Sequence, residues 1–408
     1  MVPKGWTLGT LKDLADTIMG YAFRSEDFVP TGIPLLRMGN LYQNTLDLNR
    51  NPVYLPDSFK VDYKRFLVSP GDLVMSMTGT MGKRDYGFTV EIPSNTQCSL
   101  LNQRVLKIVP KNNASSGYIL NLLRSELILS VLYSFPGGTK QANLSAKQLQ
   151  ELPVLIPPEL EQKKIAQILS TWDKAISVTE KLLTNSQQQK KALMQQLLTG
   201  KKRLPDENGV SFSGAWKWLR AAELFKTISQ KNNSEDEELL AVTQDLGVIP
   251  RSMLERRVVM PDGSTKGYKL VVPGNFIISL RSFQGGLEYS RYRGLVSPAY
   301  TVLTPIKKIV DEFYKQYYKS YDFIGHLAVA VIGIRDGKQI SYEDFSFLKL
   351  PYPEIEEQQK IAAVLSAADA EISTLEKKLA CLRDEKKALM QQLLTGKRRV
   401  KVDEAVAE

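Results

Sequence analysis

The chain has 408 residues, of which 43% are hydrophobic and 24% are charged, a composition ordinary for a globular protein of two or more domains. No apolar run approaches the length of about eighteen residues that a membrane span needs, the N-terminus has no apolar signal-peptide core, and two cysteines far apart suggest no disulfide framework. We therefore expect a cytoplasmic protein without a membrane segment. The net charge of +10 favours a polyanionic partner such as nucleic acid, although mildly basic proteins without such a partner are common.

Residues 1–150 are predicted to form a first globular domain. Short apolar stretches, such as those at 33–38, 72–77 and 105–109, are separated by Gly and Pro. This pattern is typical of short strands joined by turns. A helical stretch from Tyr118 to Tyr133 and a glycine-containing loop complete the domain.

Residues 151–203 are predicted to form a helical spacer, with one long helix at about 159–199. Apolar or small side chains recur at alternating steps of four and three residues, the period of a coiled-coil seam. Pro157-Pro158 suits a helix start and Gly200 a helix end. We interpret Lys190, the charged member of the stripe, as a snorkelling stem at the edge of the coil. The stripe comprises Ile165, Leu169, Trp172, Ile176, Thr179, Leu183, Ser186, Lys190, Leu193 and Leu197.

The same order of elements is predicted for the second half of the chain. A polar linker at 204–214 leads to a second globular domain at 215–346. A second helical spacer follows at 347–400, and the charged tail at 401–408 is expected to fray. The second stripe comprises Ile361, Leu365, Ala368, Ile372, Leu375, Leu379, Leu382, Lys386, Leu389 and Leu393.

The two halves are an internal repeat. The twelve residues from Lys190 to Lys201 recur unchanged from Lys386 to Lys397, at an offset of 196 residues. The globular domains match only weakly, as in Trp6 and Trp216 at an offset of 210. Nearly identical helices beside strongly diverged globules indicate that the two helices meet one shared constraint and that the two globules do not.

No segment carries a recognisable catalytic or metal-binding motif. Asn51-Pro52-Val53-Tyr54 lacks the second proline of an adenine methyltransferase box and is interpreted as a turn. Asp57 and Asp62 are too close in sequence for the carboxylate set of a nuclease, and there is no phosphate-binding Gly-Lys-Ser/Thr. The one histidine, His326, cannot form a zinc site with two distant cysteines. We predict that the chain is not an enzyme and binds neither a metal nor a cofactor.

Basic side chains, accompanied by amides and aromatic rings, gather on predicted loops of both globules. Arg and Lys suit phosphates and guanine edges, whereas Asn and Gln suit adenine edges. Any single one is more often a solvated surface residue, but together, in a basic protein with two diverged domains, they favour a DNA-binding face. The candidate DNA-binding residues are Arg37, Asn40, Thr78, Lys83, Arg84, Arg104, Lys140, Gln141, Arg281, Gln284, Arg291, Arg293, Arg335 and Lys338.

With these features the sequence resembles the specificity subunit of type I restriction-modification enzymes over nearly its whole length. The resemblance rests on the paired Glu-Gln-x-Lys-Ile-Ala segments at 161–166 and 357–362, on the paired Lys-Lys-Ala-Leu-Met-Gln-Gln-Leu-Leu-Thr-Gly ends, and on the Trp-led starts of both globules. It implies an α+β fold with two target-recognition domains of mixed short strands and helices. Each domain is followed by a long helix, and the two helices are implied to pair as an antiparallel coiled coil.

The resemblance also implies the function and the partners. Each recognition domain is expected to read one half of a bipartite double-stranded DNA target, without catalysis by this chain. The helices are expected to dock two modification subunits, which carry S-adenosylmethionine, and restriction subunits complete the nuclease. The predicted docking and coiled-coil residues are Ile165, Leu169, Trp172, Ile176, Leu183, Leu193, Leu197, Ile361, Leu365, Ile372, Leu379, Leu389 and Leu393.

Two other functions remain open on the sequence alone. The chain is alternatively a coiled-coil scaffold with incidental basic globules, or a self-contained DNA enzyme. Sequence-specific retention of DNA by the assembled complex separates the first alternative from DNA recognition. A methylation assay on the isolated chain tests the second.

Overall fold

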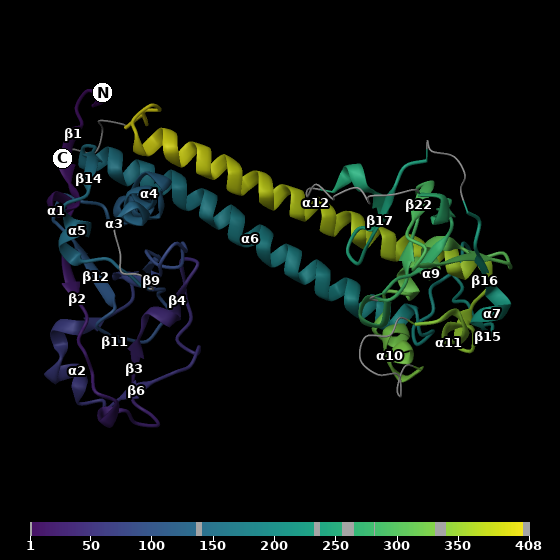
Figure 1. The fold of residues 1–408 in the computed structure, drawn as a ribbon. Coiled ribbons are helices and arrows are strands. Elements are labelled where there is room, and N and C mark those ends of the chain that lie inside the picture. Colours follow the sequence, from purple (N-terminus) through teal and green to yellow (C-terminus); the bar gives the residue numbers. More distant parts are fainter. Residues whose placement is uncertain are drawn as a thin grey trace. The chain divides into compact units, whose positions relative to one another are not determined.

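The computed structural model describes residues 2–135, 141–231, 237–254, 265–280, 282–330 and 340–402. These divide into two compact units. Unit 1 consists of Met1–Thr179 with Lys378–Glu408, and unit 2 consists of Glu180–Lys377. Each unit therefore contains one globule together with part of both long helices (Figure 1). The separation of globules from helical spacers that the sequence predicts stays a prediction.

Unit 1 is built on two four-stranded sheets, with strand orders β10-β8-β12-β2 and β6-β3-β11-β7. The first sheet is antiparallel, whereas β3 and β11 of the second pair in parallel. The strands are β1 (Thr7–Thr10), β2 (Ala15–Met19), β3 (Ile33–Leu36), β4 (Leu41–Tyr42), β5 (Thr45–Leu46), β6 (Tyr54–Leu55), β7 (Leu67–Val68), β8 (Leu73–Ser76), β9 (Thr78–Thr80), β10 (Thr89–Glu91), β11 (Ser99–Leu101), β12 (Val105–Pro110), β13 (Gln141–Asn143) and β14 (Pro153–Ile156).

The helices of unit 1 lie mainly after the sheets in the sequence. The single helical stretch predicted at 118–133 is wrong in one respect, because the helix breaks at Ser125. The Ser125 hydroxyl donates to the Leu122 carbonyl, and its extended backbone ends one helix and begins the next. The helices that begin in unit 1 are α1 (Leu11–Leu14), α2 (Phe59–Asp62), α3 (Ser116–Arg124), α4 (Glu126–Ser134), α5 (Ala146–Gln150) and α6 (Glu159–Leu197).

Unit 2 repeats the antiparallel sheet of unit 1 in the order β16-β23-β20-β21. Its strands are β15 (Lys217–Arg220), β16 (Phe225–Ile228), β17 (Leu240–Thr243), β18 (Gly247–Pro250), β19 (Lys269–Val271), β20 (Phe276–Ile278), β21 (Glu288–Tyr289), β22 (Gly294–Val296), β23 (Thr301–Pro305) and β24 (Lys349–Tyr352). The helices that begin in unit 2 are α7 (Ala221–Leu224), α8 (Ser282–Gly285), α9 (Asp311–Tyr317), α10 (Tyr321–Ala330), α11 (Tyr342–Ser346) and α12 (Ile355–Leu394).

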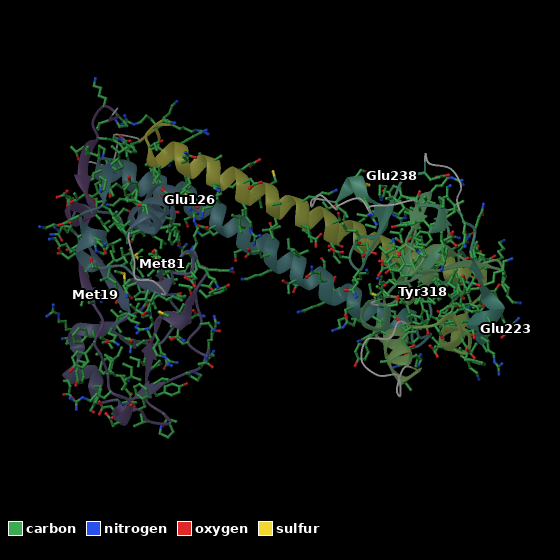
Figure 2. All side chains as sticks on the ribbon, viewed as in Figure 1. Met19, Met81, Glu126, Glu223, Glu238 and Tyr318 are labelled. Carbon is green, nitrogen blue, oxygen red and sulfur yellow. The ribbon has the colours of Figure 1, made fainter. Side chains whose placement is uncertain are left out.

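The cores of the two units contain different types of side chain, although both units have the same antiparallel sheet. Leu, Ile and Met dominate the main core of unit 1, whereas buried aromatic rings from Phe225, Phe276, Tyr318 and Phe345 contact one another in unit 2. Tyr318 lies within the densely packed side chains of this unit (Figure 2). Aromatic pairs of this kind prefer edge-to-face or tilted contacts, so the second core has been repacked on a shared frame.

The stripes predicted on α6 and α12 lie on the covered faces of these helices. Every stripe position in both helices is buried or half-buried. Ile165 and Leu169 join the core of unit 1, and Ile361 and Leu365 join that of unit 2. Among the described residues, no helix combines the length and the apolar character that crossing a bilayer requires.

Lys190 and Lys386 correct the interpretation of the charged stripe position. In unit 2 the Lys190 ammonium pairs with the Asp369 carboxylate. In unit 1 the Lys386 Nζ lies 2.6 Å from the Asp173 carboxylate. Each lysine thus contacts the other long helix instead of extending to solvent as a snorkelling stem. Because a polar pair in an apolar seam fixes register, these pairs favour one antiparallel alignment within each unit.

A buried carboxylate joins three distant segments of unit 2. Glu357, at the start of α12, is 1% exposed and accepts hydrogen bonds from the Arg203 guanidinium at 2.5 and 2.7 Å. The indole Nε1 of Trp216 donates to the same carboxylate at 2.9 Å, and the guanidinium lies 5.7 Å from the Trp216 ring centre. Gly200 ends the helical region with φ of +70°, and a Cβ there would lie 3.4 Å from the Trp216 ring. We call this Glu–Arg–Trp cluster the clasp of unit 2.

Unit 1 contains the equivalent clasp. Glu161, at the start of α6, accepts from the Trp6 indole at 3.0 Å and from the Arg399 guanidinium. Arg399 follows α12, just as Arg203 follows α6. The arginine of each clasp therefore comes from the repeat that does not supply its glutamate and tryptophan.

The clasps predict unequal losses of stability. Glu357→Gln should lower the free energy of unfolding by about 3–5 kcal/mol, because removing one partner of a buried ion pair leaves the other charge uncompensated. Glu161→Gln should cost less, because the Glu161 and Arg399 side chains are 12% and 41% exposed. Chemical denaturation followed by circular dichroism measures both losses.

The matched control is Glu376→Gln, which removes an exposed carboxylate of α12 and should change the free energy of unfolding by less than about 0.5 kcal/mol. Equal losses for Glu357→Gln and Glu161→Gln would contradict the ranking by burial.

Candidate nucleic-acid interface

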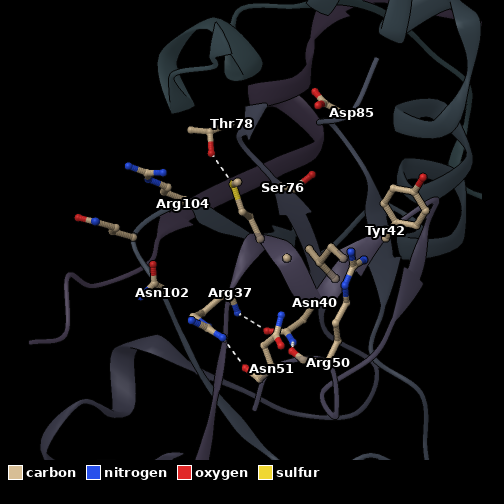
Figure 3. Close-up of a pocket in the computed structure, with 14 residues that line it drawn as sticks. Arg37, Asn40, Tyr42, Arg50, Asn51, Ser76, Thr78, Asp85, Asn102 and Arg104 are labelled. Carbon is tan, nitrogen blue, oxygen red and sulfur yellow. Dashed lines mark hydrogen bonds between the residues drawn. The ribbon is translucent and has the colours of Figure 1, made fainter. Parts of the chain in front are cut away.

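A polar hollow of about 560 Å³ opens on unit 1. It brings together four of the predicted DNA-binding residues, namely Arg37, Asn40, Thr78 and Arg104 (Figure 3). Three arginines face a single carboxylate, so the hollow is positively charged. Its lining residues are Arg37, Met38, Gly39, Asn40, Leu41, Tyr42, Arg50, Asn51, Ser76, Thr78, Asp85, Asn102, Gln103 and Arg104.

Strand pairing explains why these residues meet. β3 and β11 are parallel, with Leu36 opposite Leu101, so the residues that follow them, Arg37 and Asn102, leave the sheet at the same edge. β12 pairs antiparallel with β8, and the Met77 amide donates to the Arg104 carbonyl at 3.1 Å. The turn between β11 and β12 is thereby placed beside β8 and β9.

Asn40 organises the wall of the hollow and does not present its amide to a ligand. Its Oδ1 accepts from the Arg37 backbone amide at 2.9 Å, and its Nδ2 donates to the carbonyls of Asp47 and Arg50 at 2.9 and 3.0 Å. The side chain is buried. The prediction that Asn40 reads a base edge therefore differs from the structure, because its hydrogen-bonding groups already hold the loop. Thr78 is similarly buried and donates to the Met38 sulfur.

The three arginines differ in how they are held. The Arg37 guanidinium donates to the Asn51 carbonyl, and Asn51 sits in the left-handed region with φ of +49°. The Arg50 guanidinium lies 5.4 Å from the ring centre of Tyr42, which is 50% exposed. Arg104 is exposed, and its guanidinium has no hydrogen-bond or ion-pair partner within the described part of the chain. Arg104 is therefore the cation of the hollow best placed to meet a ligand.

Asp85 supplies the one carboxylate of the hollow. Partial burial acts to raise its pKa, but hydrogen bonds from the Thr80 hydroxyl and backbone amide outweigh burial and hold the pKa below its ordinary value. Asp85 is thus charged at neutral pH. A carboxylate accepts from a base amino group and repels phosphate, so it makes the hollow selective in what it accepts.

The remaining candidates of unit 1 lie beside the hollow rather than in its lining. Lys83 is exposed on the loop after β9. Arg84 is bound to the Glu126 carboxylate at 3.0 and 3.1 Å and lies 5.0 Å from the Tyr133 ring centre, so it fastens this loop to α4. Gln141 lies in β13 opposite Thr80. Lys140 is outside the described residues.

In unit 2 the described candidates are mostly engaged within the protein. Arg291 pairs with Glu312 and Arg293 with Glu237, so neither is the free cation that the sequence suggests. Gln284 is exposed on α8. Arg281, Arg335 and Lys338 lie outside the described residues.

A second hollow of about 430 Å³ in unit 2 is lined by Arg291 and by the ion pair of Glu288 with Lys319. Glu288 is 1% exposed and accepts from the Lys319 ammonium, which also donates to two backbone carbonyls. Burial raises the pKa of Glu288 to about 7, against the opposing effect of Lys319. Its second oxygen has no hydrogen-bond partner among the described residues, which agrees with a carboxyl group that retains its proton near neutral pH.

The sequence did not identify Arg50, Asn51 or Asn102 as members of a site. The pairing of β3 with β11 and the loop held by the Asn40 side chain place all three residues in the hollow. Neither the strand pairing nor the loop conformation can be recognised from the local sequence. Within the described ranges, no group of three or more His, Cys, Asp or Glu side chains is placed to hold a metal ion.

Comparison with known proteins adds independent evidence. The sequence matches the family model of the type I restriction modification DNA specificity domain twice, over residues 3–185 and 215–382. It is 26% identical to a protein of Methanocaldococcus jannaschii provisionally named the type I restriction enzyme MjaX specificity subunit, over 98% of this chain and 95% of the relative. It is 27% identical to the EcoAI specificity subunit of Escherichia coli, over 44% of this chain and 30% of the relative.

Two solved structures share the fold. The S subunit of a type I restriction-modification system from M. genitalium superposes with a TM-score of 0.59 at 14% identity, covering 96% of both chains. A chain from a structure of a type I restriction-modification system, solved to explain its assembly and conformational transition, gives 0.55 at 15% identity and covers 98% of this chain and all of the other (100%). The α+β fold expected from the sequence is confirmed.

The Glu288 carboxyl group predicts a pH dependence of stability. Its pKa is about 7 in the folded chain and 4.5 in its ordinary state, so between these values the folded chain binds more protons than the unfolded chain. The stability contribution is therefore fully present below pH 4.5 and is lost as the pH rises toward 7. Glu288→Gln keeps a carbonyl acceptor for Lys319 and should remove this slope. Urea denaturation from pH 5 to 8 measures it, and parallel curves for the two proteins would contradict the assignment.

Proposed function

The chain belongs to the family of type I restriction-modification DNA specificity proteins, and from this premise we propose that its two globules each read one half of a bipartite DNA target while its long helices hold two modification subunits. The observation that carries the proposal is the cationic hollow of unit 1. An exposed Arg104 and the amides of Asn102 and Gln103 offer guanine-reading and adenine-reading groups at one place.

The two copies of the specificity domain support a division of labour. Their long helices end in an identical segment, at 190–197 and 386–393, whereas the loops that follow equivalent strands differ in length and in side chains. Two readers of different half-sites require different loops. Two identical partners require equal docking surfaces, which the repeated helices provide.

The family assignment makes this chain a DNA-recognition subunit and not a catalytic one. We propose that the modification subunits hold S-adenosylmethionine and perform the methyl transfer, and that restriction subunits complete the complex. The complex would act in the cytoplasm, where it meets DNA. A scaffold function without DNA recognition would not explain the cationic hollow or the divergence of the globules.

Arg104 should be a sequence-reading residue. Arg104→Ala should relax discrimination at one position of one half-site by about 1–3 kcal/mol, because a bidentate arginine–guanine contact contributes that much. Competition binding of the assembled complex to duplexes varied at each target position measures the change.

Arg65→Ala is the matched control, since Arg65 is an exposed arginine of the same globule that does not line the hollow. It should leave discrimination unchanged at every position. A uniform loss of affinity for all duplexes with Arg104→Ala would make Arg104 a phosphate contact, and no loss would place the reading surface elsewhere.

The globules should be exchangeable. Replacing residues 1–150 with the matching part of a relative should change one half-site and leave the other intact, because unit 1 and unit 2 have separate cores. Sequencing of methylated DNA from cells that carry the exchanged chain reads both halves. A simultaneous change of both half-sites would show that the two globules do not read independently.

A further inference from the structure

The two globules present exposed arginines on different turns beside one equivalent strand. β11 of unit 1 and β22 of unit 2 occupy the same place in their units. Leu100 of β11 lies opposite Leu35 in parallel pairing, and Leu295 of β22 lies opposite Leu239 in the same sense. Each of these strands has one turn before it and one turn after it, and the four turns differ in the side chains that they carry.

The turn after the strand can distinguish bases in unit 1 but not in unit 2. Residues 102–104 of unit 1 are Asn, Gln and Arg, and all three line the cationic hollow. The equivalent residues of unit 2, 297–300, are Ser, Pro, Ala and Tyr. Both turns lead into equivalent strands, because β12 pairs with β8 as β23 pairs with β20. The turn of unit 2 therefore lacks the arginine and the amides that distinguish guanine from adenine.

The turn before the strand shows the reverse distribution. It begins at Ile92 in unit 1 and at Ser290 in unit 2, since each of these residues exchanges backbone hydrogen bonds with the Pro-Gly turn that follows β7 or β19. Residues 93–98 of unit 1 are Pro, Ser, Asn, Thr, Gln and Cys, without a charge. Residues 291–293 of unit 2 are Arg, Tyr and Arg, and all three are exposed. The exposed cations thus lie at opposite ends of the equivalent strand.

The Arg-Tyr-Arg turn of unit 2 is held in one conformation by Ser290, whose side chain is buried. The Ser290 hydroxyl accepts from the Tyr292 amide at 3.3 Å and donates to the Tyr292 carbonyl at 2.9 Å. Tyr292 is 36% exposed between the two arginines and, with Arg291, lines the hollow of about 430 Å³. Its ring is therefore available for apolar contact with a thymine methyl group.

Two carboxylates orient the arginines of this turn and leave donors free on each. Arg291 pairs with Glu312, and the Arg293 Nε donates to Glu237 at 2.9 Å, yet the two arginine side chains are still 60% and 57% exposed. Because a guanidinium has five N–H donors in a planar fork, one carboxylate leaves donors for a base edge. Ion pairs this exposed contribute little to stability, so folding alone does not require two arginines here.

We propose that unit 2 reads its half-site with Arg291, Tyr292 and Arg293, on the turn before β22, whereas the reading turn of unit 1 follows β11. The inference rests on the proposed function for DNA recognition and goes beyond it by naming the residues that read the second half-site. Arginine recognises guanine through its O6 and N7 atoms, so this half-site should contain a guanine on one of its strands.

The length of the strand allows both turns to meet DNA on the same side of a globule. β22 has three residues and therefore spans about 10 Å. The major groove is about 12 Å wide. The reading residues of unit 2 are thus displaced from the position of Arg104 in unit 1 by about one strand length, which is less than the width of the groove.

Arg291→Lys and Arg293→Lys test the proposal, because lysine keeps the positive charge and the ion pair but loses the planar fork. In the assembled complex, each variant should lose about five- to 150-fold of its discrimination at one target position. That position should lie outside the half-site that Arg104→Ala alters. Competition binding to duplexes varied at each position measures the change. Arg220→Lys is the matched control, since Arg220 is an exposed arginine of unit 2 that does not line the hollow, and it should leave every position unchanged.

Two results would overturn this assignment while leaving the proposed function intact. Equal changes for all duplexes, or no change in a complex whose wild-type form is selective, would show that Arg291 and Arg293 do not read bases. A change confined to the half-site that Arg104→Ala alters would place these residues in the reading of the first half-site. A wild-type complex that binds every duplex equally would instead refute the proposed function, and the assignment with it.

Discussion

Glu357 and Glu161 each hold together three segments of chain that are far apart in sequence. A carboxylate as buried as Glu357 is stable only when its charge and its lone pairs are matched, and a guanidinium fork with an indole N–H supplies that match. Because the arginine comes from the end of one long helix and the glutamate from the start of the other, neither unit can be completed by a single sequence repeat. The division of the chain into units that each draw on both repeats follows from this pairing.

The glutamine that follows each clasp glutamate extends the same frame into the globule. Gln162 accepts from the Ser115 amide and donates to the Pro157 carbonyl, and Gln358 makes the matching pair of bonds with Val310 and Pro353. The Glu-Gln of the repeated motif thus attaches a helix start to the globule through polar contacts that do not depend on the rest of the core. This independence allows one core to be aliphatic and the other aromatic on the same frame.

The sequence predicts features that depend on interactions between residues close in the chain. It does not predict features that depend on contacts between residues far apart in the chain. The stripes on α6 and α12 were predictable because helical periodicity is local. The role of Lys190 was predicted wrongly because its partner, Asp369, lies on the other long helix. Of the candidate reading residues, Asn40 was selected for its amide, yet that amide holds its own loop. Asn102 was overlooked because its neighbourhood depends on the parallel pairing of β3 with β11, which no local pattern reveals.

Comparison of the exposed residues in the two repeats distinguishes the requirements of folding from the requirements of function. Packing restricts the residues on the buried faces of both long helices. Sequence similarity on these faces therefore shows only that both helices pack against apolar side chains. On the exposed side folding leaves the choice of residue open. Identity at Gln195 and Gln391 beside divergence at Lys174 and Ala370 therefore agrees with the proposal that the two helices meet identical partners. In the globules, loops on a shared frame carry different side chains, which agrees with the proposal that the two globules meet different DNA sequences.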